Sequence, residues 1–203
     1  GMIYQVKGDS SAASEMFQIV LADEELPDSL RGNALNQLGV TEYYQGNTHA
    51  AIKHLSQAKD IINRTSGLFH RAKIYLELEL AYRDTGDTVR ANECLEKQID
   101  LWQQVNNPEP LAMALNNLGY RYYEKGHYDL ADRTYQQGLD TISNMKSTRS
   151  RYYLMASLAD LQRDRGHFGE ARKTYQKTLN LIGNREPYAK IEALINLSTL
   201  YRW

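Results

Sequence analysis

The 203-residue sequence has one cysteine, four prolines and no long apolar segment. Cys94 therefore has no partner for a disulfide within the chain, which fits a reducing compartment and predicts a cytoplasmic location. No apolar run approaches the roughly 18 residues that a transmembrane helix needs, so we expect no membrane partner. The shortage of proline and the absence of low-complexity runs favour a folded chain over a disordered one.

An excess of charge is also missing, because 24 Lys and Arg residues oppose 25 Asp and Glu residues. Proteins that bind nucleic acids use a basic patch to neutralise phosphates, so this balance argues against a nucleic-acid partner. The glycines stand singly and do not form a phosphate-binding loop. No histidine pair with metal-ligand spacing lies on one helical face; the five histidines are His49, His54, His70, His127 and His167. We therefore expect no enzyme activity, no metal and no cofactor, and Cys94 is interpreted as a small buried apolar residue.

The sequence does contain a repeat of about 40 residues. Single glycines are separated by 38, 40, 40 and 40 residues, at Gly8, Gly46, Gly86, Gly126 and Gly166. An alanine follows each glycine by five residues, at Ala13, Ala51, Ala91, Ala131 and Ala171. A leucine precedes each of the last four glycines by eight residues, at Leu38, Leu78, Leu118 and Leu158. Several marks that recur at one period indicate an array of similar structural units.

One unit shows what the repeat encodes. Before Gly126, the spacing of Leu115, Leu118 and Tyr122 is that of one helical face. Gly126 ends that helix, because glycine tolerates the positive φ of a helix terminus. A second apolar face follows, with Leu130, Ala131 and Tyr135 among its members. The unit is predicted to be a hairpin of two amphipathic helices, here called the A helix and the B helix.

This hairpin resembles the tetratricopeptide repeat (TPR) family. The residues that match the family pattern are Leu115, Leu118, Gly119, Tyr122, Ala131 and Tyr135. The usual period is about 34 residues, and the longer period found here resembles the repeats of kinesin light chains and of bacterial regulator sensor domains. The chain departs from the pattern at Glu42, Glu79, Gln98, Gln162 and Thr178. The resemblance implies an all-α, right-handed superhelical solenoid of antiparallel helical hairpins.

We expect a single solenoid domain over residues 1–203. Its hairpins are predicted at about 2–24, 28–64, 68–105, 108–144 and 148–182, with a truncated helix at 187–203. In the first unit, Gly8 is expected to end a short helix and to open a B helix. The last helix has no B helix after it, so the chain is predicted to be a fragment of a longer protein. The apolar flank that this helix leaves uncovered consists of Ile191, Leu194, Leu197 and Tyr201. Such a flank predicts a weak homodimer through the C-terminal end.

A slower period of 80 residues overlies the first. The set Asn36, Gly39 and Tyr43 recurs as Asn116, Gly119 and Tyr123. The pair Arg83-Asp84 recurs in the same way as Arg163-Asp164. The array therefore alternates two kinds of repeat, which indicates duplication of a two-repeat block.

In TPR proteins the A helices line a concave groove, and the resemblance assigns the groove positions of this chain. The candidate peptide-binding residues are Asn33, Asn36, Gln37, Tyr43, Lys73, Glu77, Arg83, Asn116, Asn117, Tyr120, Tyr123, Tyr153, Asp160 and Arg163. Asn and Gln carry a hydrogen-bond donor and an acceptor together, so they can bind a peptide backbone of any sequence. Tyrosine adds a rigid contact surface at low entropic cost. The family's carboxylate clamp is not expected, because Lys73 is the single lysine among these positions.

The predicted function is non-catalytic binding of a protein or peptide segment in the groove. A second hypothesis is a segment of a bacterial multidomain regulator that senses a small effector. A third is a spacer or self-association module without a groove ligand. For each candidate residue the alternative remains that it is a solvated polar residue on a helix surface.

Overall fold

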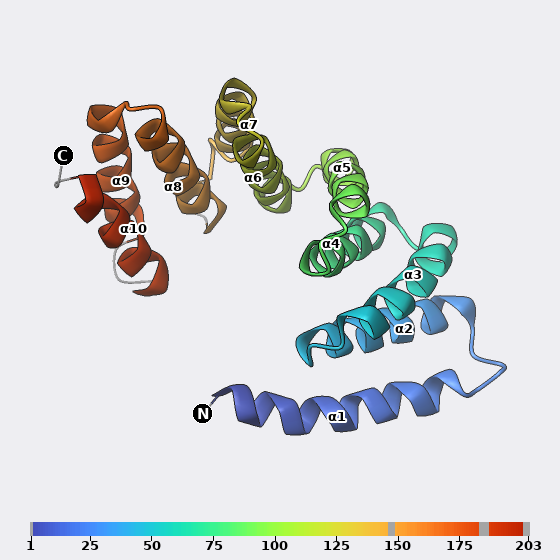
Figure 1. Cartoon of the computed structure of the whole chain (residues 1–203). Helices are drawn as coiled ribbons and strands as arrows, with labels where there is room; N and C mark the ends of the chain where they lie inside the picture. Colours follow the sequence, from blue (N-terminus) through green and yellow to red (C-terminus); the bar gives the residue numbers. More distant parts are fainter. Residues whose placement is uncertain (1, 146–148, 183–186, 201–203) are drawn as a thin grey trace. The chain divides into compact units, whose positions relative to one another are not determined.

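The structure is a computed structural model that describes residues 2–145, 149–182 and 187–200. These residues form helices joined by short turns and contain no strand (Figure 1). The bounds are α1 Met2–Leu21, α2 Asp28–Tyr44, α3 Thr48–Thr65, α4 Leu68–Asp84, α5 Thr88–Val105, α6 Pro108–Glu124, α7 Tyr128–Thr141, α8 Arg149–Asp164, α9 Phe168–Ile182 and α10 Pro187–Leu200. The predicted all-α class is therefore confirmed.

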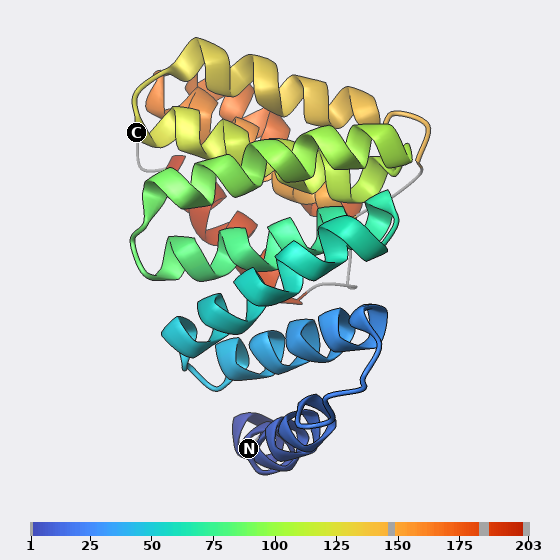
Figure 2. The same ribbon diagram turned by 90° about the vertical axis from the view of Figure 1, so that its right-hand side faces the viewer.

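Residue contacts divide the chain into two compact units, Gly1–Val105 and Asn106–Trp203. In the first unit α2 pairs with α3 and α4 pairs with α5, while α3 packs against α4. In the second unit α6 pairs with α7 and α8 with α9, while α7 packs against α8 and α9 against α10. Figure 2 shows α4 and α5 lying side by side, joined by a tight turn. Each unit is thus a stack of A–B hairpins; a single continuous solenoid over the whole chain stays a prediction.

The four turns within the hairpins contain the glycines that the repeat predicted. Gly46, Gly86, Gly126 and Gly166 have φ of +86°, +78°, +73° and +79°. A Cβ at any of them would meet nothing within 4 Å, so the backbone conformation alone requires glycine. The next residue closes the helix end, as where the amide of Asn47 donates to the carbonyl of Glu42 at 2.9 Å.

Gly8 does not form a turn, contrary to the prediction. Helix α1 runs without a break from Met2 to Leu21, so the predicted hairpin at 2–24 is a single helix. Glycine permits a turn but does not impose one, and its cost inside a helix is only about 1 kcal/mol. Helix α1 packs against α2, in the position that a B helix takes before the next A helix.

Close approach of the A and B helices depends on small residues. A Cβ added to Gly119 of α6 would lie 2.5 Å from the ring of Tyr135 in α7, and one added to Gly39 would lie 2.7 Å from Leu55. Ala131, on the facing side of the hairpin, is 0% exposed. The equivalent of Gly39 and Gly119 in α4 is Glu79, which is fully buried and lies 3.8 Å from Arg83.

Two of the predicted departures from the family pattern are each matched by a polar residue on the B helix of the same hairpin. Glu42 replaces a tyrosine, and its carboxylate lies 2.7 Å from Nδ1 of His54, twelve residues later in the B helix. Gln162 occupies the same repeat position and accepts a hydrogen bond from Thr174, also twelve residues later, at 2.8 Å. The buried Glu42 and the half-buried Gln162 therefore each have a partner within their own hairpin.

Arginines tie two of the A helices, α2 and α8, to the end of the preceding B-type helix. The Arg31 guanidinium donates to the carbonyls of Leu21 at 3.2 Å and Asp23 at 2.6 Å. In the second unit Arg151 donates to the carbonyls of Ile142 and Met145. The last carbonyls of a helix lack helical partners and carry negative partial charge, so a cation satisfies them.

The last helix departs from its predicted exposure. Ile191 and Leu194 are 54% and 46% exposed, as expected for an uncovered flank. Leu197 is only 6% exposed, because it packs with the core residues Ala159, Ala171 and Tyr175. Tyr201 lies outside the described residues.

Replacing Gly119 by Ala should destabilise the fold by about 1–3 kcal/mol, because the fully buried Tyr135 ring has no space to move away from the new methyl group. The measurement is the free energy of unfolding by denaturant titration. The matched control is Gly169→Ala in α9, where a Cβ meets nothing within 4 Å. Equal stability of Gly119→Ala and Gly169→Ala would contradict the close approach of α6 and α7.

Candidate binding surface

The A-helix face of the first unit, formed by α2 and α4, is polar and largely accessible. Asn33, Gln37 and Lys73 are exposed, and the side chain of Arg83 is 45% exposed. Glu77 is half-buried; burial raises the pKa of its carboxyl group, and the nearby Lys73 ammonium acts in the opposite direction. The predicted residues of these two helices therefore form a surface with charges of both signs.

A hydrogen bond joins α2 to α4 on this face. The hydroxyl of Tyr43 donates to Oδ2 of Asp84 at 2.6 Å, and Arg83 lies 3.8 Å from the other oxygen of the same carboxylate. Burial and the Asp84 carboxylate raise the pKa of Tyr43 to about 12. The phenol therefore stays protonated and keeps donating at neutral pH.

The second unit contains the same cluster 80 residues later. The Tyr123 hydroxyl donates to Asp164, and Nε of Arg163 lies 2.8 Å from that carboxylate. Burial and the Asp164 carboxylate raise the pKa of Tyr123 to about 12. We call each of these sets, Tyr43–Asp84–Arg83 and Tyr123–Asp164–Arg163, a Tyr–Asp–Arg latch.

The latches give the slower sequence period a structural meaning. A tyrosine from one kind of repeat bonds to the Arg-Asp pair of the other kind, so the two-repeat block is held together across its A helices. At the opposite end of the second block, Glu109 of α6 accepts hydrogen bonds from the hydroxyl of Ser150 at 2.7 Å and its amide at 3.1 Å. Asp84 and Asp164 were missed as members of the candidate surface. Their recurrence together with the tyrosines was the available signal.

The second unit also has a hollow of about 420 Å³ on its A-helix face. Its walls are Tyr120 and Tyr123 of α6, Tyr135 of α7, Ser157, Asp160 and Arg163 of α8, and Asn196 of α10. Four predicted residues therefore meet in one place, Tyr120, Tyr123, Asp160 and Arg163. Tyr153 lies instead in an adjoining hollow of about 100 Å³, which Asp160 also lines.

Asp160 is the polar centre of this hollow. Its Oδ1 accepts hydrogen bonds from Arg163 at 2.9 Å, from Asn196 at 3.3 Å and from the hydroxyl of Tyr175. Burial raises the pKa of the Asp160 carboxyl group, and the Tyr175 and Arg163 contacts offset part of that effect. Tyr135 was predicted to lie on the apolar face of its B helix, and the equivalent residue of the next hairpin, Tyr175, extends its hydroxyl to the A-helix face.

The asparagines predicted to line the groove differ in how deeply they are buried. Asn36 is only 9% exposed, so it lies deeper than the groove prediction implied, because α4 packs beside α2. Asn116 and Asn117 are half-buried on α6. Within the part of the chain that the structure describes, the buried Oδ1 atoms of Asn36 and Asn116 have no hydrogen-bond partner. Buried acceptors are normally satisfied, so these two equivalent amides retain bonding capacity.

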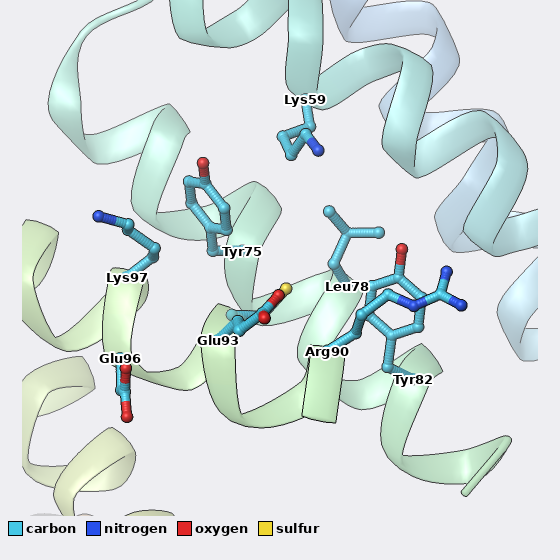
Figure 3. Close-up of a pocket in the computed structure, with 9 residues that line it drawn as sticks. Lys59, Tyr75, Leu78, Tyr82, Arg90, Glu93, Glu96 and Lys97 are labelled. Atoms are coloured by element: carbon cyan, nitrogen blue, oxygen red, sulfur yellow. The ribbon is translucent and has the colours of Figure 1, made fainter. Parts of the chain in front are cut away.

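A different pocket, of about 380 Å³, lies among α3, α4 and α5 (Figure 3). Tyr75, Leu78 and Tyr82 of α4 line it together with Arg90 of α5, whose guanidinium is 5.1 Å from the centre of the Tyr82 ring. Cys94 is buried beside it, as predicted, and burial raises the pKa of its thiol to about 11. The thiol therefore stays protonated and lacks the character of a nucleophile. No signal in the sequence predicted this pocket.

Among the described residues, no cluster of His, Cys, Asp and Glu side chains is arranged to hold a metal ion. None of their helices combines the length and apolar character needed to cross a membrane.

Comparison with known proteins gives both a family and a fold. A family model described as tetratricopeptide repeat matches residues 30–101 and again residues 71–142. No curated protein matches the sequence. Among solved structures, BtubC (BKLC) from P. vanneervenii has 16% identity and a TM-score of 0.77, covering 100% of this chain and 84% of that chain.

Two other solved structures are similar. The nearly identical TPR-like repeats of a Podosopora anserina putative kinesin light chain have 19% identity and a TM-score of 0.71, covering 90% of this chain and 92% of that chain. A Signal Transduction ATPase with Numerous Domains (STAND) protein with a tetratricopeptide repeat sensor, PH0952 from Pyrococcus horikoshii, has 16% identity and a TM-score of 0.78. The match covers 98% of this chain but 34% of that protein. At these identities the likeness shows the fold alone, and it confirms the predicted TPR solenoid class.

Removal of one latch hydroxyl should weaken the packing of neighbouring A helices. We expect Tyr43→Phe to lower the free energy of unfolding by about 0.5–1.5 kcal/mol, the usual net contribution of one hydrogen bond. The control is Tyr44→Phe, because the adjacent Tyr44 is 71% exposed. A double-mutant cycle with Asp84→Asn measures the coupling. Additive effects of Tyr43→Phe and Asp84→Asn would show that the latch contributes no stability.

Proposed function

The chain belongs to the tetratricopeptide repeat family, and we propose that it binds a protein or peptide segment on the A-helix faces of its hairpins. The fold is that of interaction and sensor modules, and proteins of this family are typically non-catalytic scaffolds. The proposed role is accordingly non-covalent binding without a cofactor. A cytoplasmic location is part of the proposal and is supported by the single, buried Cys94.

The observation that carries this proposal is the composition of the A-helix face in the second unit. Tyr120, Tyr123, Asp160 and Arg163 border one hollow, and Asn116 and Asn117 lie on the same helix as the two tyrosines. Amides, phenols and a carboxylate can together satisfy the polar groups of an extended peptide. The phenol rings add contact area that loses little conformational entropy on binding.

The sensor hypothesis is supported by the same hollow, whose volume is within the range of small-molecule sites. The two hypotheses differ in the size of the ligand. A peptide would extend beyond the hollow along α6 and would require the Asn116 and Asn117 amides. A small effector enclosed by the hollow would not.

Self-association through α10 also stays a prediction. Ile191, Leu194 and Ile195 are exposed on this helix, while Leu197 is not. Exposed apolar residues favour association in water. Sedimentation of the wild-type chain beside a variant with Ile191→Lys and Ile195→Lys distinguishes a dimer through α10 from a monomer.

Selection from a displayed peptide library against the purified chain tests the proposed function. Affinities of the selected peptides are then measured for the wild type and for the double variant Asn116→Ala, Asn117→Ala. We expect binding to weaken by about 1–3 kcal/mol, because the peptide backbone loses its amide hydrogen bonds. Thermal unfolding of the double variant checks that the hairpin is still folded.

The control double variant is Gln136→Ala, Gln137→Ala, which removes two amides from the exposed surface of the B helix α7. It should bind the selected peptides like the wild type. Failure to select any peptide, or equal affinity of the Asn116→Ala, Asn117→Ala variant and the wild type, would show that this A-helix face is not a peptide site.

A further inference from the structure

The hollow of the second unit has features that its counterpart positions in the first unit lack. Both units carry a latch, but three residues that line the hollow, together with Tyr175, whose hydroxyl bonds to Asp160, correspond to aliphatic residues 80 positions earlier. Tyr120, Tyr135, Asp160 and Tyr175 stand where the first unit has Val40, Leu55, Leu80 and Leu95. The aliphatic set is sufficient for hairpin packing, as the fully buried Leu55 and Leu95 show. The polar set therefore requires a reason other than folding.

The charges around Asp160 leave an excess of negative charge. The charged groups that act on its carboxylate are Arg163 and Asp164. Arg163 is shared between them, at 2.9 Å from Asp160 and 2.8 Å from Asp164. The other side chains against Asp160 are neutral, namely the Tyr175 hydroxyl from α9 and the Asn196 amide from α10. Two carboxylates and one guanidinium thus give this site a net charge of about −1.

One oxygen of Asp160 remains open to a ligand. All three hydrogen bonds from Arg163, Tyr175 and Asn196 end on Oδ1. Within the described residues Oδ2 has no hydrogen-bond partner, and it is not among the atoms that are sealed from solvent. A half-buried carboxylate with one free oxygen is a strong acceptor for a cationic donor.

Aromatic rings border the same space. Tyr120 is 50% exposed, and its ring centre lies 6.0 Å from that of Tyr123. The faces of such rings attract ammonium and guanidinium groups. The apolar part of the ring wall also suits the methylene stem that carries such a group.

We propose that this hollow binds the basic side chain of a peptide partner, with Asp160 accepting a hydrogen bond from its ammonium or guanidinium group and Tyr120 packing against its stem. The inference rests on the proposed function and adds the chemical class of one ligand residue. It places the basic side chain next to the Asn116 and Asn117 amides, which contact the peptide backbone on the same helix. The first unit has no equivalent site, because Leu80 and Val40 replace the carboxylate and the ring.

The direct test uses Nα-acetyl-lysine methylamide as the probe and Nα-acetyl-norleucine methylamide as the matched probe without charge. Titration of the isotope-labelled chain, followed by NMR, should shift the amide signals around Tyr120, Ser157, Asp160 and Asn196 with the lysine probe only. Asp160→Asn should weaken that binding about tenfold or more, the value of a charge-assisted hydrogen bond. Tyr120→Leu should weaken it about threefold through loss of the ring face.

The matched control is Asp132→Asn, which changes an exposed carboxylate on the B helix α7 of the same unit and should leave binding of the lysine probe unchanged. Equal shifts with the lysine and norleucine probes would overturn the proposal. So would wild-type affinity of Tyr120→Leu and Asp160→Asn; Tyr120→Leu alone decides the question if Asp160→Asn does not fold. Binding of free putrescine without binding of the lysine probe would overturn the assignment to a peptide side chain.

Selected peptides separate this inference from the proposed function. Replacing the basic residue of a selected peptide by norleucine should weaken binding to the wild type about tenfold and leave binding to Asp160→Asn nearly unchanged. A peptide that tolerates this replacement, yet loses affinity for the Asn116→Ala, Asn117→Ala variant, would overturn the cation site and leave the proposed function standing. If the wild-type chain binds the lysine probe but binds no peptide, that result would instead refute the proposed function.

Discussion

The structure depends first on how closely the two helices of each hairpin approach. Gly119 leaves no room for a Cβ against Tyr135, and Ala131 is completely buried on the opposing helix. A solenoid unit contacts only its neighbours, so each hairpin must be well packed by itself before it can stack. The small residues between the helices and the glycines in the turns satisfy this packing requirement, and they occupy only a few positions of each repeat. The outward surface of each A helix is consequently free to vary without loss of the fold.

The latches use that freedom to couple one hairpin to the next. Tyr43 and Tyr123 each reach the Asp of the following A helix, so the two-repeat block is joined by a hydrogen bond in addition to apolar packing. Hydrogen bonds from Arg163 and Tyr123 lower the pKa of the Asp164 carboxyl group despite its burial, and burial together with the Asp carboxylates raises the pKa of Tyr43 and of Tyr123 to about 12. The carboxylate therefore stabilises the protonated phenol, and the Tyr123 phenol in turn stabilises the ionised form of Asp164. The same polar contacts fix the side-chain positions from which the hollow of the second unit is built.

Features that depend on residues close together in the sequence could be predicted, whereas side-chain contacts between distant segments could not. Turn glycines such as Gly126 and small packing residues such as Ala131 are local and periodic, so the sequence revealed them. Gly8 was misread because a glycine is equally compatible with an uninterrupted helix where no following contact requires a turn. The hollow was predicted only in part, because the repeat frame assigns Tyr175 and Asn196 to their helices but does not reveal that both side chains reach Asp160. The orientation of a side chain within its repeat position is decided by such neighbours.

Comparison of the two latch-bearing blocks separates residues needed for folding from residues available for recognition. The Tyr, Arg and Asp of the latch occur in both blocks, and both blocks fold as paired hairpins. Asp160 occurs in one block only, where burial of its carboxylate carries a desolvation cost that Leu80 avoids. Its bonds to Arg163, Tyr175 and Asn196 offset that cost through a single oxygen and leave the second oxygen accessible to a ligand. A cation bound to that second oxygen would add to this compensation, so a residue that is costly to bury is also well placed to select a ligand.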